Sequence, residues 1–284
     1  MKRNRKITYL RVLIVIMAIA CGTASTAQQH TDLERMNLRD SVEFIREIIY
    51  STSGSSSNGS GRLISSDKYL SFRPDGNITE TLVYEKGRLF SVLRYEYDEE
   101  GRKTGYREYD AQDRLYLTVD YKHEDGLVKE ERIDRSLQKM FDDKRREIDV
   151  EYHKYYQNLY TRIVYDHNFS GKITGATYYN PDSTLDFRYE YAYNYKGHRV
   201  TSSYYNSDNK LSWKEKYTND LTGNPIQIQR FENNRLVSTT IVEYELDKSG
   251  NWISRIESVE TLPNVFGEKP EANSTVTIRE IGYF

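Results

Sequence analysis

The chain has 284 residues, of which 37% are hydrophobic and 30% are charged, and its mean hydropathy is −0.81. This composition argues against a protein with many membrane-spanning helices and against a large, wholly buried core. It also argues against disorder, because 26 Tyr, 9 Phe and 2 Trp are far more than a solvated tail contains. The chain is expected to fold, with tyrosine rings supplying much of its apolar surface.

Residues 1–27 have the pattern of a secretory signal peptide. A basic start precedes the uncharged stretch from Val12 to Cys21, which is too short to span a bilayer, and small residues follow up to Ala27. We expect cleavage after Ala27 and a secreted or periplasmic protein. The alternative is a membrane-anchored lipoprotein in which Cys21 carries the lipid and associates the protein with the outer membrane, although Ala18 stands where such signals usually have Leu.

Removal of the leader makes the protein acidic and free of cysteine. Five of the 41 basic residues and none of the 43 acidic ones lie in residues 1–27, which leaves 36 against 43 and a formal net charge of −7. This balance disfavours nucleic acid as a partner, since phosphates require basic clusters. Because Cys21 is the only cysteine, the mature chain has no disulfides, and its stability must come from packing and backbone pairing.

A repeat of about 25 residues begins after the lead-in at residues 28–40 and fills residues 41–284. Its clearest mark is a glycine after polar turn residues, at Gly76, Gly101, Gly126, Gly171, Gly197, Gly223 and Gly250. Eight residues after five of these glycines comes an aromatic ring, in Tyr84, Tyr109, Tyr179, Tyr205 and Phe231. A second turn and a leucine follow each ring, so that each unit has the order strand, turn, strand, turn.

The segments between turns are β-branched, aromatic and partly alternating, as in 172–179 and 226–231, which favours strands over helices. We therefore predict an all-β fold: an extended, curved antiparallel β-meander of repeated hairpins, with some sixteen strands. The first and last strands of such an open array would have exposed edges, and these could pair with another sheet.

Four segments depart from the repeat. Residues 127–170 fit either a degenerate repeat, which we favour, or an insertion with one short helix within 135–150. Residues 41–50 favour an opening strand, and the Ser- and Gly-rich residues 51–61 a flexible loop. Residues 261–273 contain two prolines and indicate a long loop before a last strand at 275–284.

Residues 97–102, Tyr-Asp-Glu-Glu-Gly-Arg, match the Tyr-Asp-x-x-Gly-Arg core of Rhs/YD-repeat proteins. Weaker copies begin at Tyr165, Tyr193 and Glu245, and the chain from residue 36 onward resembles the small secreted or lipid-anchored YD-repeat proteins of Bacteroidota. The resemblance implies a secreted β-meander, in a family whose small members mostly lack a known activity. Because Asp98 becomes Asn194 in a later copy, the resemblance does not carry over any role that requires this aspartate in every unit.

No pattern of residues indicates an enzyme, a cofactor or a metal site. Residues 166–171 resemble the start of a calcium loop, but Thr177 stands where the loop needs a bidentate acid, so we interpret the segment as a hairpin turn. The five histidines have no metal-type spacing, and no catalytic motif for a nucleophile, phosphate or zinc occurs. A polysaccharide hydrolase with dispersed carboxylates is the least favoured alternative.

The strongest candidate for a binding surface is aromatic. Exposed rings stack on sugars or anchor protein partners, and one stretch concentrates them at Tyr191, Tyr193, Tyr204, Tyr205, Trp213 and Tyr217. The competing interpretation is that these rings only cover the sheet. The leading hypothesis is thus a non-enzymatic β-repeat scaffold or binding protein of the cell envelope, with an unknown protein or glycan partner, and the alternative is a glycan-binding module.

Overall fold

The computed structural model describes residues 31–52, 63–134, 161–262 and 272–284. The predicted leader with Cys21, most of the two predicted loops and the alternative helix within 135–150 lie outside these residues. The described part contains one short helix, α1 (Asp32–Arg35), and no helix there is long and apolar enough to cross a membrane.

Sixteen strands make up nearly all of the rest of the described chain. Their bounds are β1 Val42–Thr52, β2 Leu63–Phe72, β3 Ile78–Glu85, β4 Arg88–Tyr97, β5 Lys103–Asp110, β6 Leu115–Glu124, β7 Leu127–Asp134, β8 Arg162–His167, β9 Ile173–Tyr179, β10 Leu185–Tyr193, β11 Arg199–Tyr205, β12 Leu211–Asn219, β13 Pro225–Glu232, β14 Arg235–Leu246, β15 Trp252–Thr261 and β16 Ala272–Tyr283. The predicted opening strand at 41–50 is confirmed as β1, and the predicted last strand as β16.

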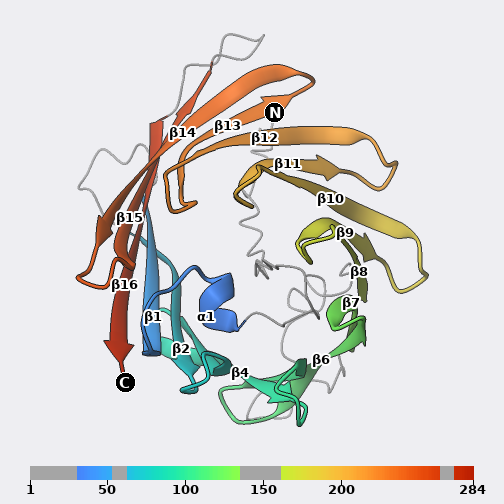
Figure 1. The fold of residues 1–284 in the computed structure, drawn as a ribbon, viewed down its shortest axis with the longest axis vertical. Coiled ribbons are helices and arrows are strands. Elements are labelled where there is room, and N and C mark those ends of the chain that lie inside the picture. Colours follow the sequence, from blue (N-terminus) through green and yellow to red (C-terminus); the bar gives the residue numbers. More distant parts are fainter. Residues whose placement is uncertain (1–30, 53–62, 135–160, 263–271) are drawn as a thin grey trace, which may run out of the picture.

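The strands form one closed antiparallel barrel, in which each strand pairs with its neighbours in the sequence and β1 also pairs with β16 (Figure 1). The all-β, antiparallel prediction is confirmed, but the predicted open meander with exposed first and last edges is wrong. Paired positions join β1 to β16 from Val42 opposite Tyr283 to Thr52 opposite Ser274. A long twisted sheet curls, and joining its two ends satisfies the backbone groups that an open edge would expose.

The repeated turns explain the glycine spacing. In the β4–β5 turn, the N–H of Gly101 donates to the carbonyl of Asp98 at 3.0 Å, and the N–H of Asp98 donates to the carbonyl of Arg102 at 2.9 Å. Gly101 has a φ of +77° there, and Gly197 has a φ of +81° in the equivalent β10–β11 turn. Glycine adopts positive φ without the steric cost that a side chain adds, so it recurs at this position.

The tyrosine and aspartate of the repeat motif both stabilise the hairpins. Asp98 Oδ1 accepts the N–H of Arg102 at 2.8 Å, and Asn194 Oδ1 accepts the N–H of His198 at 3.0 Å. Asparagine thus supplies the same acceptor oxygen, which explains why it can replace aspartate at this position of the repeat. The preceding rings bind the first residue of the previous strand: the hydroxyl of Tyr97 donates to Ile78 O at 2.6 Å, and that of Tyr193 to Ile173 O at 2.7 Å.

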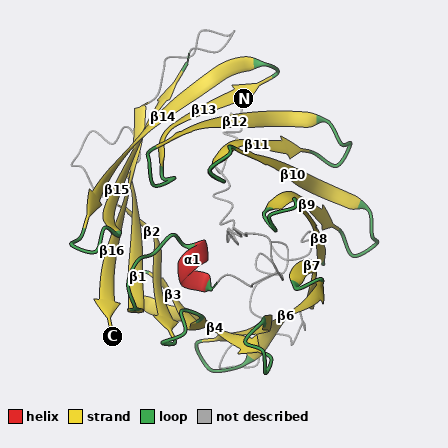
Figure 2. Ribbon diagram, in the orientation of Figure 1, coloured by secondary structure: helices red, strands yellow, loops and turns green. Residues whose placement is uncertain are grey.

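Helix α1 lies inside the ring of strands (Figure 2). Asp32 of α1 contacts Tyr97 and Lys103, so these side chains face inward. Side chains alternate between the two faces along each strand, and residues that lie opposite each other on paired strands share a face. The inward residues of the other strands can therefore be identified from the strand pairing. Tyr95, for example, lies opposite Tyr106, so both face inward.

Among the described residues, the buried apolar side chains form two clusters on the inner wall, which in a sixteen-stranded barrel is too wide for its side chains to fill. One cluster joins α1 to its nearest strands through Leu33, Val42, Ile45, Phe72 and Ile78. The other covers the inner face of β8–β10, with Ile163, Tyr165, Ile173, Ala176, Tyr178, Phe187 and Tyr189. The composition argued against a large, wholly buried core, and the two small clusters agree with that expectation.

The outer face carries ion pairs on several of its strands and on the β5–β6 turn. Arg46 lies 3.0 Å from Asp67, Arg94 lies 2.9 Å from Asp113, and Arg107 pairs with both Glu96 and Asp120. Arginines also cover outer tyrosine rings: the guanidinium carbons of Arg94, Arg162 and Arg188 lie 4.6, 4.4 and 3.7 Å from the ring centroids of Tyr109, Tyr179 and Tyr205. The outer face of these strands therefore carries charged groups, whereas Ile241, Ile256 and Ile278 are exposed on β14–β16.

Candidate functional site

The short helix α1 is held by local and long-range contacts. Thr31 caps its start: the N–H of Glu34 donates to Thr31 Oγ1 at 3.3 Å, and the N–H of Thr31 donates to Glu34 Oε2 at 2.9 Å. The N–H of Leu33 donates to the carbonyl of Gly76 at 3.0 Å, which joins the helix to the β2–β3 turn. These contacts place α1 against the inner wall near one end of the barrel.

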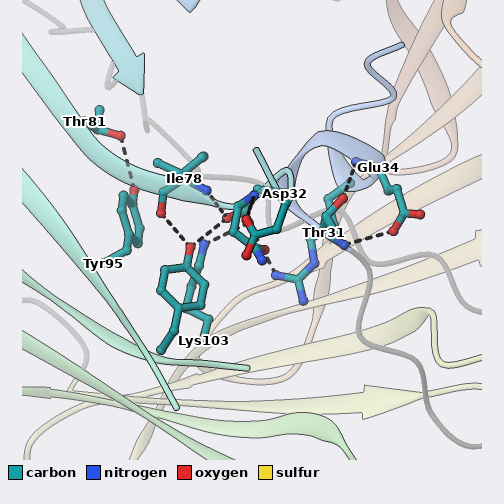
Figure 3. Close-up of polar contacts among 11 residues, drawn as sticks. Thr31, Asp32, Glu34, Ile78, Thr81, Tyr95 and Lys103 are labelled. Carbon is teal, nitrogen blue, oxygen red and sulfur yellow. Dashed lines mark hydrogen bonds and ion pairs between the residues drawn. The ribbon is translucent and has the colours of Figure 1, made fainter. Parts of the chain in front are cut away.

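Asp32 binds three groups of the inner wall (Figure 3). Its Oδ1 accepts from Lys103 Nζ at 2.8 Å, and its Oδ2 accepts the N–H of Ile78 at 2.9 Å and lies 3.1 Å from the Tyr97 hydroxyl. Lys103 Nζ also lies 4.4 Å from the ring centroid of Tyr95. These donors offset the free-energy cost of removing the Asp32 carboxylate from water.

The charges of this cluster are shifted by their surroundings. Burial alone would raise the pKa of Asp32, but the Lys103 ammonium and the hydrogen bonds outweigh it, so the pKa lies below the ordinary 3.8. Desolvation lowers the pKa of Lys103, against the opposing effect of Asp32. Burial and the nearby Asp32 carboxylate raise the pKa of Tyr97, which stays protonated and donates.

Aromatic side chains follow the inner wall from β4 to β12, and we call this series the aromatic arc. Ring centroids are 5.6 Å apart for Tyr95 and Tyr106, 4.2 Å for Tyr178 and Phe187, and 5.4 Å for Tyr204 and Trp213. The members of the arc are Tyr95, Tyr106, Tyr121, Tyr165, Tyr178, Phe187, Tyr189, Tyr204 and Trp213. Edge-to-face and offset-stacked contacts of this kind add stability beyond the buried area.

One carboxyl group interrupts the arc. Glu131 of β7 lies opposite Tyr121 and Ile163, and its Oε1 accepts the hydroxyl of Tyr165 at 2.8 Å. Burial raises the pKa of Glu131 from 4.5 to about 7, and the Tyr165 hydrogen bond and the Lys103 charge only partly offset this effect. Glu131 is thus an inner-wall acid whose pKa lies near neutral pH.

The other part of the inner wall, from β14 through β16 to β2, is charged, and we call it the charged sector. Arg279 Nε donates to Glu47 at 2.8 Å, with its guanidinium carbon 3.4 Å from the ring centroid of Trp252. Arg255 pairs with Glu257 on the same strand. Arg279 Nη1 and Arg255 Nε are buried without a protein hydrogen-bond acceptor. This side of the inner wall is therefore charged, whereas the arc from β4 to β12 is aromatic.

The six aromatic residues predicted as a binding surface do not share one face, and all six are half-buried. By strand register, Tyr204 and Trp213 face inward and belong to the arc. Tyr191 and Tyr217 also face inward, at 5.5 and 5.1 Å from the guanidinium carbon of Arg199. Tyr205 faces outward and binds Glu190, while Tyr193 closes a hairpin at the barrel end.

Trp213 is flanked by two neighbours on the inner wall. The Tyr204 ring stacks on it with an interplanar angle of 10°, and the guanidinium carbon of Arg230 lies 4.5 Å from its ring centroid. A sugar that stacks on Trp213 would therefore have to displace Arg230.

The segment that resembled a calcium loop is the hairpin β8–β9, as predicted. Asn168 Oδ1 accepts the N–H groups of Ser170 and Lys172, both at 3.0 Å, so the turn already uses this oxygen. Within the described ranges, no group of three or more His, Cys, Asp and Glu side chains is arranged to hold a metal ion. Desolvation lowers the pKa of His167 to about 4, which keeps the ring neutral at physiological pH.

The sequence analysis missed the Asp32 cluster, because residues 28–40 were interpreted only as a lead-in. A local signal was present: Thr31 followed by Glu34 is a capping-box pattern, which predicts a helix start. The partner Lys103 had no such signal, since it lies 71 residues further along the chain.

The chain is similar to known proteins in its fold and not in its sequence. No model of a known protein family matches the chain, and no curated protein matches it in sequence. Among solved structures, a porin-like protein from Bacteroides uniformis is 12% identical with a TM-score of 0.54, over 85% of this chain and 98% of the other. A second porin-like protein, from Bacteroides vulgatus, is 12% identical with a TM-score of 0.41, over 86% and 99%. Only the first score is high enough to support a shared fold.

Proposed function

We propose that the protein is a non-enzymatic, water-exposed β-barrel of the bacterial cell envelope that binds its ligand on the inner wall. The observation that carries this proposal is the contrast between the two faces of β4–β6 and their neighbours: arginine ion pairs lie outside, and the aromatic arc and the charged sector lie inside. A wall of this kind presents its aromatic and charged side chains to the lumen, where ligand-binding barrels hold their ligands.

The envelope location rests on two supports. Residues 1–27 have the pattern of an export signal, and the neighbour that shares the fold is described as porin-like. A membrane-spanning barrel, however, exposes an apolar band to lipid, and a charged side chain at the bilayer midplane costs about 2–4 kcal/mol. The outward ion pairs at Arg94 and Arg107 therefore favour a barrel in the aqueous periplasm or at the cell surface over a pore.

The behaviour of the chain without detergent tests the first part of the proposal. Residues 28–284 are produced without the leader and purified in plain buffer. We expect a monodisperse monomer-sized species with a β-rich circular dichroism spectrum. A chain that stays soluble only in detergent, and that conducts ions in planar bilayers, would show instead that the barrel spans a membrane.

A glycan is the second candidate ligand, and the aromatic arc favours it, because aromatic rings stack on the apolar faces of sugars. Titration with oligosaccharides, selected from a glycan array, would change the fluorescence of Trp213. Removing Arg230, as Arg230→Ala, should uncover the Trp213 ring and strengthen such binding severalfold, whereas Trp213→Ala should weaken it. Equal binding by all three proteins would exclude this surface.

A further inference from the structure

Three adjacent hairpins at one end of the barrel each present a large apolar side chain to solvent. The tips of β8–β9, β10–β11 and β12–β13 carry Phe169, Tyr195 and Leu221, whose exposed fractions are 106%, 94% and 87%. Alternate connections of an antiparallel barrel lie at the same end, so the three tips share one end. We call them the apolar tips.

The turn chemistry that produced the repeat also fixes these positions. Each apolar tip directly follows the turn residue whose Oδ1 accepts backbone N–H groups, namely Asn168, Asn194 and Asp220. The apolar residue therefore has the same place in every turn and points away from the hairpin. None of the three contributes to packing, since each is almost fully exposed.

Contacts between the turns hold the three tips in one row. Lys172 Nζ donates to the carbonyl of Gly197, which joins the first turn to the second. The His198 ring packs so closely on Gly223, in the third turn, that a Cβ there would lie 2.8 Å from it. Tips on neighbouring hairpins are two strand spacings apart, about 10 Å.

Exposed lysines lie in and beside the row, together with Asp220 and Asp247, whose carboxylates accept hydrogen bonds within their turns. Lys196 follows Tyr195 and is exposed, with its Nζ 5.9 Å from the Tyr195 ring centroid. The next hairpin, β14–β15, has the exposed Lys248 at the equivalent tip position. The β4–β5 hairpin, further around the same end, instead has Glu99 and Glu100. This end of the barrel thus has one side with the apolar tips and exposed lysines and another side with exposed glutamates.

We propose that the apolar tips are a membrane-contact edge, which inserts Phe169, Tyr195 and Leu221 into the interface of an anionic lipid bilayer. Three separate side chains, each nearly bare, suit a fluid interface, whereas a protein partner would need three matched pockets about 10 Å apart. Tyrosine favours the headgroup level, and Lys196 is placed to bind anionic headgroups.

The position of the amino-terminal segment agrees with this orientation. The described chain begins at Thr31, beside Gly76 of the β2–β3 turn, at the same end of the barrel as the apolar tips. Cys21 precedes Thr31 by ten residues, a span of at most about 35 Å, so a lipid on Cys21 would attach the same end to the same surface. The proposal concerns the barrel end and does not depend on what the inner wall binds.

The test uses residues 28–284, which contain every described element and lack Cys21, so that no attached lipid contributes. Binding is measured by co-sedimentation with vesicles of phosphatidylethanolamine and phosphatidylglycerol, and with vesicles of phosphatidylcholine alone. We expect the protein to bind the anionic vesicles more strongly. The triple variant Phe169→Ser, Tyr195→Ser, Leu221→Ser should reduce partitioning of the protein into vesicles at least about a hundredfold. The variant Lys196→Glu should reduce it about tenfold, and only for the anionic vesicles.

A matched control replaces three exposed apolar residues elsewhere, as Ile64→Ser, Leu211→Ser, Ile241→Ser, whose exposed fractions are 53%, 43% and 45%. This variant should bind vesicles as the unchanged protein does, and circular dichroism confirms that all variants remain β-rich. The proposal is overturned if the unchanged protein does not sediment with anionic vesicles, if the tip variant binds as well as the unchanged protein, or if the control loses binding to the same degree.

Discussion

Asp32 and Lys103 show how a buried polar pair connects the helix to the barrel wall. Their side chains are only 8% and 9% exposed, whereas in the outer pair of Arg94 with Asp113 the side chains are 47% and 68% exposed. Removing one partner of a buried pair leaves an uncompensated charge, which costs far more than losing a screened surface contact. The two pairs should therefore respond very differently to substitution.

Lys103→Met is expected to lower the free energy of unfolding by about 3 kcal/mol, because it removes the nearer of the two cations of the buried Asp32 carboxylate and leaves Arg35 at 3.7 Å. Arg94→Ala should cost no more than about 1 kcal/mol. Urea unfolding measured by circular dichroism compares the two. The double variant Asp32→Asn, Lys103→Met should recover part of the loss, and the interpretation fails if Lys103→Met is as mild as Arg94→Ala.

Glu131 should make stability depend on pH near neutrality. Its pKa is raised from 4.5 to about 7 by burial, so between these values the folded protein keeps a proton that the unfolded chain has lost. Stability therefore falls as pH rises through this window, by up to about 3 kcal/mol. Glu131→Gln keeps the Tyr165 hydrogen bond and removes the titration.

The matching measurement is urea unfolding at about pH 5 and about pH 8 for both proteins. Glu131→Gln should be more stable than the unchanged protein at the higher pH and nearly equal to it at the lower. A stability difference that does not change with pH would show that Glu131 has an ordinary pKa.

At the scale of the hairpin, the sequence was informative because turn geometry is local. The positive φ of Gly101 and Gly197, and the side-chain oxygens of Asp98 and Asn194, are requirements that a few consecutive residues meet by themselves. The periodic glycines therefore predicted the hairpins, and the replacement of Asp98 by Asn194 has a simple reason in the shared Oδ1.

This account predicts the effects of substitution at Asn194. Asn194→Ala removes the acceptor for the N–H groups of Lys196 and His198, both at 3.0 Å, and should cost about 1 kcal/mol. Asn194→Asp should be nearly neutral, since it restores the Oδ1 acceptor. Thermal unfolding of the two variants decides the question, and equal losses for both would contradict the role assigned to the oxygen.

At the scale of the whole molecule, closure decides the properties of the barrel. The pairing of β1 with β16 removes the free edges that the open meander would have had and that could have paired with another sheet. It also creates two faces with different environments. The aromatic residues that seemed to cover a sheet became, in large part, the lining of a lumen.

Deleting residues 272–284, which contain β16, should therefore expose the edges of β1 and β15. We expect the truncated chain to form soluble oligomers or aggregates through these edges, with the far-UV spectrum still β-rich. Size-exclusion chromatography with light scattering measures the change. A truncated chain that remains a stable monomer would indicate that closure contributes little to the integrity of the barrel.

The residues that we predicted as a binding surface are divided between the two faces of the barrel. The stretch from Tyr191 to Tyr217 does contribute Tyr204 and Trp213 to the aromatic arc, but Tyr205 faces outward, because neighbouring residues of a strand point to opposite sides. The charged sector was not predicted, since Glu47 and Arg279 are 232 residues apart and meet only through the closing strand pair.

By itself, the sequence determined the hairpins, their antiparallel succession and the approximate number of strands, because each depends on turns and alternation within some 25 residues. Only the tertiary structure decided that the sheet closes, which face becomes the interior, and that α1 is anchored there through Asp32 and Lys103. These features depend on contacts between residues far apart in the chain. The twist of the sheet, summed over all its strands, brings these residues together, and it cannot be predicted from any short segment of the sequence.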